Sequence, residues 1–302
     1  MAAVSLVASA GFLARAATPE EAPAESRVQV QAALKALEPF FARKTRHLAH
    51  GERGSIEQAI HGYAPGSFHP VDEGALPAAQ ADARCPADMA SIEGRFCIDR
   101  YEGTLVQRDD TGAMQPWPPF TPPLPPEGRI LLARSVAGVV PQAYISAAQA
   151  AQACGAVGKR LCQPVEWRAA CGGSQGTAYP YGPARVAGKC HDTGVAPMLV
   201  FHLPEMKKGW GPLELNDPRL NQLEGTVAKT GAFPECVNDY GVYDMVGNLH
   251  EWTADPHGTF QGGFWLDTDL HGEACAYRTI AHDYGYHDYS TGFRCCAAST
   301  PK

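Results

Sequence analysis

Apolar residues recur at helical spacing in the N-terminal part of the chain. Between Arg27 and His47 they stand at positions 28, 32, 34, 37, 40 and 41, behind Ser26, a residue type that suits a helix N-terminus. This spacing predicts one amphipathic helix, and a shorter helix is predicted over residues 55–63. Both lie between segments rich in Pro, Ala, Gly and acidic residues, which are typical of linkers.

Two further helices are predicted in the middle of the chain. Ser146 precedes an alanine-rich segment that ends near Gly158, so it is expected to cap a helix there. Pro164 stands in the first turn of a second helix that reaches Cys171. From there to Phe233 the sequence is rich in Gly and Pro and predicts mostly irregular structure.

Strand patterns are short. Residues 95–103 alternate as in a half-buried strand, and further strand candidates are residues 241–245, 251–254, 262–266 and 292–297. Short helices and short strands with many turns indicate an α+β fold with little regular secondary structure.

These patterns divide the chain into three parts. Residues 1–17 are small and apolar with an A-x-A site at positions 14–16, and they resemble a signal peptide, although no basic residue precedes the apolar stretch. Residues 18–83 are predicted to be linkers with a short helical arm, and residues 84–300 a folded domain. The apolar N-terminal stretch is too short to predict a membrane span, so no integral membrane segment is expected.

The composition of the chain indicates its partners and its cellular compartment. The net charge of −7 and the lack of a Lys/Arg cluster argue against a nucleic-acid partner. Ten cysteines lie between Cys85 and Cys296 without a CxxC pair, which favours disulfides over buried free thiols with a metal site. The domain is therefore expected to be periplasmic, at the cell surface or secreted.

Four segments, in this order, carry a family resemblance: residues 96–102 (FCIDRYE), 158–167 (GKRLCQPVEW), 241–252 (GVYDMVGNLHEW) and 292–295 (GFRC), with Gly262-Gly263 between the last two. Over residues 84–298 the chain resembles the formylglycine-generating-enzyme (sulfatase-modifying factor) family. The resemblance implies a variant of the C-type-lectin fold, in which long loops are held by calcium and disulfides.

The resemblance also bears on the cysteines. It implies the pairs Cys154–Cys295 and Cys171–Cys275. The short loop between Cys85 and Cys97 makes them a local pair, and Cys162 and Cys296 lie next to family positions that already pair, so a parallel disulfide is expected. Cys190 and Cys236 remain as the fifth pair.

The resemblance implies one calcium site in the third segment. Asp244 and Glu251 would supply carboxylate oxygens, and Gly247 and Leu249 backbone carbonyls, which is a donor set that suits calcium. The alternative interpretation is an acidic turn whose carboxylates are solvated. A second family calcium site would fall at Lys189 and Cys190, where a lysine stands in place of an oxygen donor.

The resemblance does not extend to the catalytic residues. The family's enzymes oxidise a substrate cysteine with a pair of copper-binding cysteines, placed shortly after the glycine pair. Here residues 264–274 read FWLDTDLHGEA and contain no cysteine, and Phe264 replaces the family's usual serine. Copper is therefore not expected. A histidine-rich loop at residues 282–289, with His250 and His271 elsewhere, leaves an iron site as an alternative. We expect this segment to be a polar surface loop instead.

Two functions remain open. The first is an exported binding or accessory domain without oxidase activity, with an unknown peptide, protein or glycan ligand. Its expected groove is formed by Trp265, Asp267, His282 and His287, with tyrosines 284, 286 and 289 nearby, because aromatic side chains are good contact anchors. The second is a metal-dependent oxidoreductase of the same family with a non-cysteine ligand set. A purely structural envelope protein is a third, weaker alternative.

Overall fold

The computed structural model describes residues 84–125 and 129–300. They belong to one unit of the chain, Phe68–Lys302. The signal-peptide-like segment, the linkers and the helices predicted at residues 27–47 and 55–63 lie outside the described residues. No helix in the described part is long and apolar enough to cross a bilayer.

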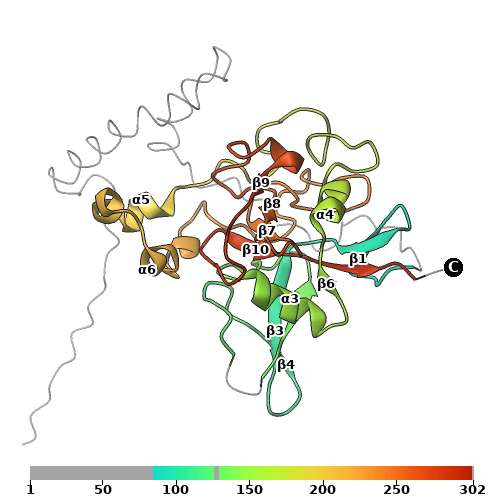
Figure 1. Ribbon diagram of the computed structural model, residues 1–302, viewed down its shortest axis with the longest axis horizontal. Coiled ribbons are helices and arrows are strands. Elements are labelled where there is room, and N and C mark those ends of the chain that lie inside the picture. Colours follow the sequence, from blue (N-terminus) through green and yellow to red (C-terminus); the bar gives the residue numbers. More distant parts are fainter. Residues whose placement is uncertain (1–83, 126–128, 301–302) are drawn as a thin grey trace, which may run out of the picture. The chain divides into compact units, whose positions relative to one another are not determined.

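Three small sheets form the framework (Figure 1). The first is antiparallel and has the strand order β1-β2-β11-β6, with bounds Met89–Ile92, Phe96–Asp99, Cys295–Ala298 and Arg160–Leu161. It brings the two ends of the domain together, because Ala298 pairs with Phe96.

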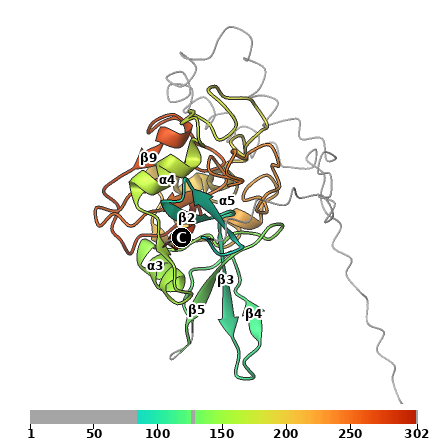
Figure 2. The same cartoon turned by 90° about the vertical axis from the view of Figure 1, so that its right-hand side faces the viewer.

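The second sheet contains Glu251, one of the expected calcium ligands, in strand β7 (His250–Trp252). Its order is β10-β7-β8-β9, with bounds Thr291–Phe293, His250–Trp252, Phe260–Gln261 and Arg278–Thr279. β10 and β7 run parallel. The third sheet has the order β4-β3-β5, with bounds Met114–Pro116, Gly103–Arg108 and Leu131–Ser135, and its β3–β4 hairpin projects from the body in both views (Figures 1 and 2).

The two central helices confirm the sequence prediction. α3 (Ala147–Gly155) begins at Ser146, whose hydroxyl accepts the amide of Gln149 while the Gln149 side chain accepts the amide of Ser146. α4 (Pro164–Cys171) has the proline in its first turn. The region up to Phe233 contains short helical turns only: α5 (Pro197–Phe201), η3 (Leu203–Lys208), α6 (Pro212–Leu215) and η4 (Leu220–Gln222).

Two predicted strands are wrong. Residues 241–245 and 262–266 contribute only isolated bridges, Val237↔Tyr243 and Phe264↔Asp267. Gly241, Asp244, Gly262 and Gly263 all have positive φ angles, which interrupt an extended strand. The segment at 292–297 is divided into β10 and β11 at Arg294, and the segment at 251–254 is β7.

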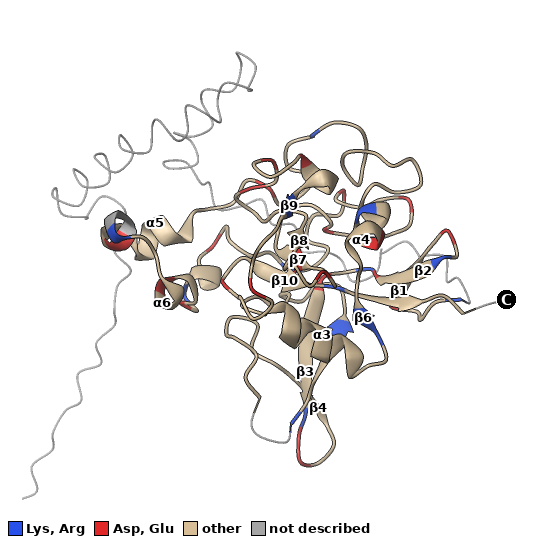
Figure 3. Ribbon diagram, viewed as in Figure 1, with Lys and Arg blue, Asp and Glu red and all other residues tan. Residues whose placement is uncertain are grey.

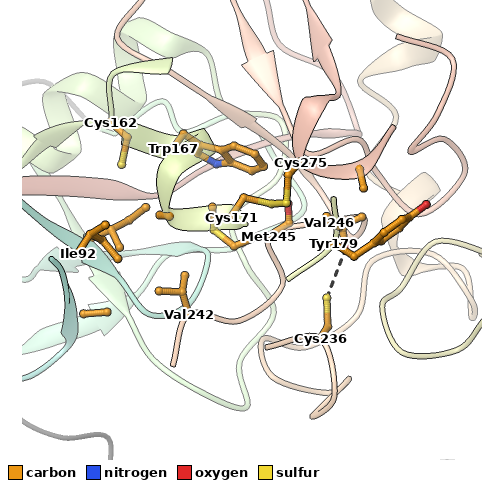
Figure 4. Close-up of a cluster of buried hydrophobic side chains, with 14 of the residues drawn as sticks. Ile92, Cys162, Trp167, Cys171, Tyr179, Cys236, Val242, Met245, Val246 and Cys275 are labelled. Atoms are coloured by element: carbon orange, nitrogen blue, oxygen red, sulfur yellow. Dashed lines mark hydrogen bonds between the residues drawn. A yellow bond between two sulfur atoms is a disulfide. The ribbon is translucent and has the colours of Figure 1, made fainter. Parts of the chain in front are cut away.

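All ten cysteines form disulfides: Cys85–Cys97, Cys154–Cys295, Cys162–Cys296, Cys171–Cys275 and Cys190–Cys236. Each is a pair that the sequence analysis expected. Figure 4 shows Cys171–Cys275 beside Trp167 in the largest core cluster, among Met245, Val246 and Tyr179. Disulfides and buried aromatic rings thus hold together a domain whose strands have at most six residues.

Candidate functional site

The turn between residues 244 and 251 contains three residues with a left-handed backbone. Gly247 has a φ of 82°, and a Cβ there would lie 2.1 Å from the carbonyl oxygen of His191, so only glycine fits. Asp244 and Asn248 have φ angles of 57° and 52°, which are uncommon for residues with a side chain. Backbone conformations of this kind are often retained at functional sites.

Three carboxylates and one guanidinium are buried around this turn. Glu102, Asp244 and Glu251 are at most 5% exposed, and Arg294 is fully buried. Arg294 pairs with both oxygens of Glu251 at 2.6 Å, and the indole N–H of Trp167 donates to the same carboxylate at 2.6 Å. One positive charge therefore faces three acidic groups.

The excess of acidic groups changes their protonation. Burial raises the pKa of Asp244 to about 7, and the Glu251 carboxylate adds to the rise, while the Gly231 amide and Arg294 oppose it. Burial and the neighbouring Asp244 and Glu251 raise the pKa of Glu102 well above its usual range. A cation that entered the cluster would reverse both shifts.

The oxygen atoms fit the calcium site that the resemblance implies. Asp244 accepts the Gly231 amide through Oδ2 and no other hydrogen bond from the described residues, so Oδ1 is free. No described residue donates to the carbonyl oxygen of Gly247 or Leu249. Glu251 already accepts hydrogen bonds from Arg294 and Trp167, so the free oxygen donors are those of Asp244, Gly247 and Leu249. A carboxylate and backbone carbonyls are donors that suit calcium. The alternative of a solvated acidic turn is wrong, because Asp244 and Glu251 are 5% and 1% exposed.

The second family calcium position carries an ammonium group instead. Lys189 Nζ lies 3.2 Å from Glu235 and 5.2 Å from the centre of the Tyr181 ring. Cys190 beside it is in a disulfide. A cation is already supplied there by the chain, so the position does not suit a second calcium ion.

In the segment after Gly262-Gly263, the carboxylate of Asp267 accepts hydrogen bonds from its own loop. Asp267 Oδ1 accepts the amides of Asp269 and Leu270 at 3.1 and 3.0 Å, and Oδ2 accepts the hydroxyl of Tyr277 at 3.0 Å. Asp267 thus holds its own loop together. With every cysteine in a disulfide, no thiolate lies in this segment or elsewhere in the chain.

The histidines pack on aromatic rings. His250 and His282 both contact Phe260, and His250 and His271 both contact Tyr277. His287 Nδ1 lies 2.6 Å from Asn216 Oδ1. His250 is buried among aromatic rings, and burial lowers its pKa to about 3. Among the described residues, no group of three His, Cys, Asp or Glu side chains could hold a metal ion.

The expected groove is not formed as the sequence analysis placed it. Trp265 is fully buried, packs on Phe264 and Tyr289, and donates its indole N–H to Val195 at 2.9 Å. Trp265 therefore belongs to the core, and Asp267 is 9% exposed and occupied within its loop. His282 and His287 keep partial exposure. Sequence spacing could not separate a buried tryptophan from an exposed one.

An open cleft lies in another part of the domain. Its volume is about 500 Å³, and its lining includes Tyr181, Lys189, Glu235 and Asp239. Lys189 and Glu235 directly precede Cys190 and Cys236, so the disulfide between them joins two walls of the cleft. Basic and acidic residues are interspersed along the ribbon without a basic stretch (Figure 3).

One residue of the acidic cluster went unassigned in the sequence analysis. Glu102 ends the first family segment, 142 positions before Asp244, and its neighbours gave no sign of the contact. An acidic residue directly before a glycine-initiated strand was the available signal, and it is a weak one. Arg294 lies in the fourth family segment, and only the folded structure shows that it is the counter-charge of this cluster.

Comparison with known families identifies the family of this chain. The sequence model of the family described as "Sulfatase-modifying factor enzyme 1-like domain" matches residues 71–299. The chain belongs to this family, and its mixed helices and strands, low regular structure and five disulfides agree with the family's C-type-lectin-like fold.

Two curated relatives carry the name "Inactive C-alpha-formylglycine-generating enzyme 2". The protein from Bos taurus is 32% identical over 137 residues, which cover 42% of this chain and 39% of the relative. The protein from Mus musculus is 30% identical over 138 residues, covering 43% of this chain and 39% of the relative. The matched part thus spans about two fifths of the length of each relative.

Solved structures are similar only at a low level. The Major Tropism Determinant I1 variant is 13% identical, with a TM-score of 0.41, and the match covers 71% of this chain and 53% of that one. The crystal structure of CarF is 18% identical with a TM-score of 0.38, and the match covers 68% and 87%. These scores carry no argument about function.

Proposed function

We propose that this chain is an exported member of the family that lacks formylglycine-generating oxidase activity and serves as a ligand-binding or accessory module. The observation that carries the proposal is that all ten cysteines are in disulfides. Copper-dependent oxidation of a substrate cysteine requires thiolate ligands, because soft sulfur donors hold Cu(I). The relatives named inactive support the same conclusion.

The oxidase proposal has a direct test. The purified chain is incubated with Cu(I), oxygen and a peptide that carries a sulfatase substrate cysteine, and mass spectrometry measures conversion of the thiol to the aldehyde. No conversion is expected, while an active family enzyme converts the same peptide. Turnover above the copper-only control would overturn the proposal.

Calcium is the cofactor that we propose, in a structural role. Asp244, Glu251 and the carbonyls of Gly247 and Leu249 would hold it, and its charge would offset the buried carboxylates. Calcium that binds the folded state with a Kd of 10 μM would stabilise it by about 2.7 kcal/mol at 1 mM. We therefore expect a higher Tm in calcium than in EDTA, and Asp244→Ala should abolish the difference. An equal Tm in both buffers for the wild type would refute the site.

The cleft is the surface that we propose for a peptide, protein or glycan ligand. Ligand sites commonly have volumes of about 300 to 1,000 Å³, and walls joined by a disulfide are already ordered before binding. Glu235→Arg should abolish binding of any ligand found on peptide or glycan arrays. Glu224→Arg is the matched control, because it makes the same charge change at an exposed residue outside the cleft lining. Equal binding by both variants would exclude the cleft.

Export is supported by the five disulfides, which form and persist in oxidising compartments. We propose a periplasmic, cell-surface or secreted location. Fractionation of the native host with N-terminal sequencing of the mature chain tests this. Recovery of the chain from the cytoplasm with reduced cysteines would contradict it.

A further inference from the structure

Glu102 is fully buried in the short link between β2 and β3, and its carboxylate reaches the turn that would hold calcium. Its Oε1 accepts the backbone amide of Leu249 at 3.2 Å, and its Oε2 accepts the side-chain amide of Asn248 at 2.6 Å. Both donors flank the carbonyl groups of Gly247 and Leu249. The carboxylate therefore holds the turn from a segment about 150 residues away in sequence.

Asn248 extends this contact to a third segment. Its Oδ1 accepts the amide of Ala228 at 2.8 Å, and its side-chain nitrogen donates to the Ala228 carbonyl at 3.3 Å. Asn248 has a left-handed backbone and is 2% exposed. The Glu102 carboxylate thus stabilises an uncommon backbone conformation at the centre of the turn.

The charges point in the same direction. Glu102, Asp244 and Glu251 are three buried carboxyl groups in one cluster, and its guanidinium, Arg294, is paired with both oxygens of Glu251. Glu102 and Asp244 thus face the turn without an ion-pair partner among the described residues. A divalent cation at the turn would supply the positive charge that both carboxylates need when ionised.

We propose that Glu102 is the positioning residue of the calcium turn and the third carboxylate that sets its preference for a divalent cation. Glu102 shapes the turn through Leu249 and Asn248 and contributes charge without being one of the four ligands. This inference rests on the calcium site proposed above.

Glu102→Gln is the main test, because it keeps the size of the side chain and removes the charge. Its matched control is Glu93→Gln, an exposed residue in the β1–β2 turn. Calcium affinity is measured by isothermal titration calorimetry, and Tm is measured in calcium and in EDTA. We expect Kd to rise at least tenfold for Glu102→Gln and the calcium-induced rise in Tm to shrink. Tm in EDTA should also fall, because glutamine offers one acceptor oxygen to the two N–H donors of Leu249 and Asn248. Glu93→Gln should match the wild type in all three measurements.

A purely structural role gives a different result. Glu102→Gln would then lower Tm by the same amount in calcium and in EDTA, with an unchanged Kd, and the inference would be overturned. Glu102→Asp is the second variant, and it decides the matter if Glu102→Gln does not fold. It keeps the charge but shortens the reach to Leu249 and Asn248, so a Kd weaker than wild type is expected, and a wild-type Kd would refute positioning. Failure of the wild type to bind calcium would instead refute the underlying site.

Discussion

Two of the disulfides lie side by side, and this arrangement predicts a specific pattern of stability. Cys154–Cys295 and Cys162–Cys296 join the same two regions of the chain, since Cys295 and Cys296 are neighbours and Cys154 lies eight positions before Cys162. The perturbation is removal of each pair alone by Cys→Ala at both members, and then of both pairs together.

The size of the effect follows from the loops that each disulfide closes. Taken alone, a loop of 134 residues would contribute about 5 kcal/mol through the entropy of the unfolded chain. With the neighbouring disulfide intact, the second one closes a ring of only about nine residues, which is worth about 2.6 kcal/mol. When both are absent, Cys171–Cys275 still limits the ring that Cys162–Cys296 would close to about 30 residues, which is worth about 3.7 kcal/mol.

Each single removal should therefore cost about 2.6 kcal/mol, plus the packing lost with two buried sulfur atoms. Removal of both disulfides should cost about 1 kcal/mol more than the sum of the two single removals. This excess is the difference between the two ring-closure terms, since the packing losses appear on both sides of the comparison and cancel. Urea denaturation followed by tryptophan fluorescence measures all four proteins. Strict additivity, or a combined effect smaller than the sum, would refute the reasoning. As a control, removal of Cys85–Cys97 should add independently, since its 12-residue loop lies outside the shared ring.

Three further predictions concern the buried charges and the core. Arg294→Met should lower the free energy of unfolding by about 3 to 5 kcal/mol, because it leaves Glu251 buried without its partner, and a loss below about 1 kcal/mol in urea denaturation would contradict the pairing. Burial raises the pKa of Asp99 to about 6 from its usual 3.8, even though Lys159 lies 2.6 Å away, so the stability that Asp99 contributes at acidic pH is lost as pH rises from about 4 to about 6. Asp99→Asn should therefore gain about 3 kcal/mol relative to the wild type across that range, and parallel pH profiles of the two proteins would exclude this. Trp265→Ala should lower the free energy of unfolding by about 3 to 5 kcal/mol, as expected of a core residue. Leu213→Ala, at an 86% exposed position, should change it by less than about 0.5 kcal/mol. Similar losses of stability for the two variants would contradict the core position of Trp265.

Features that depend on neighbouring residues could be predicted from the sequence. Ser146 and Gln149 cap α3 because their spacing of three places each side chain at the other's backbone amide, whatever the rest of the fold does. Pro164 likewise marks the start of α4. The same local logic failed for residues 241–245 and 262–266, because their positive φ angles depend on contacts across the domain.

By itself, the sequence determined the order of the motifs and the absence of a thiolate pair after Gly262-Gly263, since both depend on residue identity and spacing. Two of the cysteine pairs were implied by the family resemblance. The tertiary structure decided how the acidic turn is used. Glu102, Asp244 and Arg294 lie far apart in the chain, and only folding places them in one buried cluster with an excess of negative charge. It also placed Trp265 in the core and made Asp267 close its own loop. Burial and long-range charge are properties of three-dimensional proximity, which residue spacing along a chain does not record.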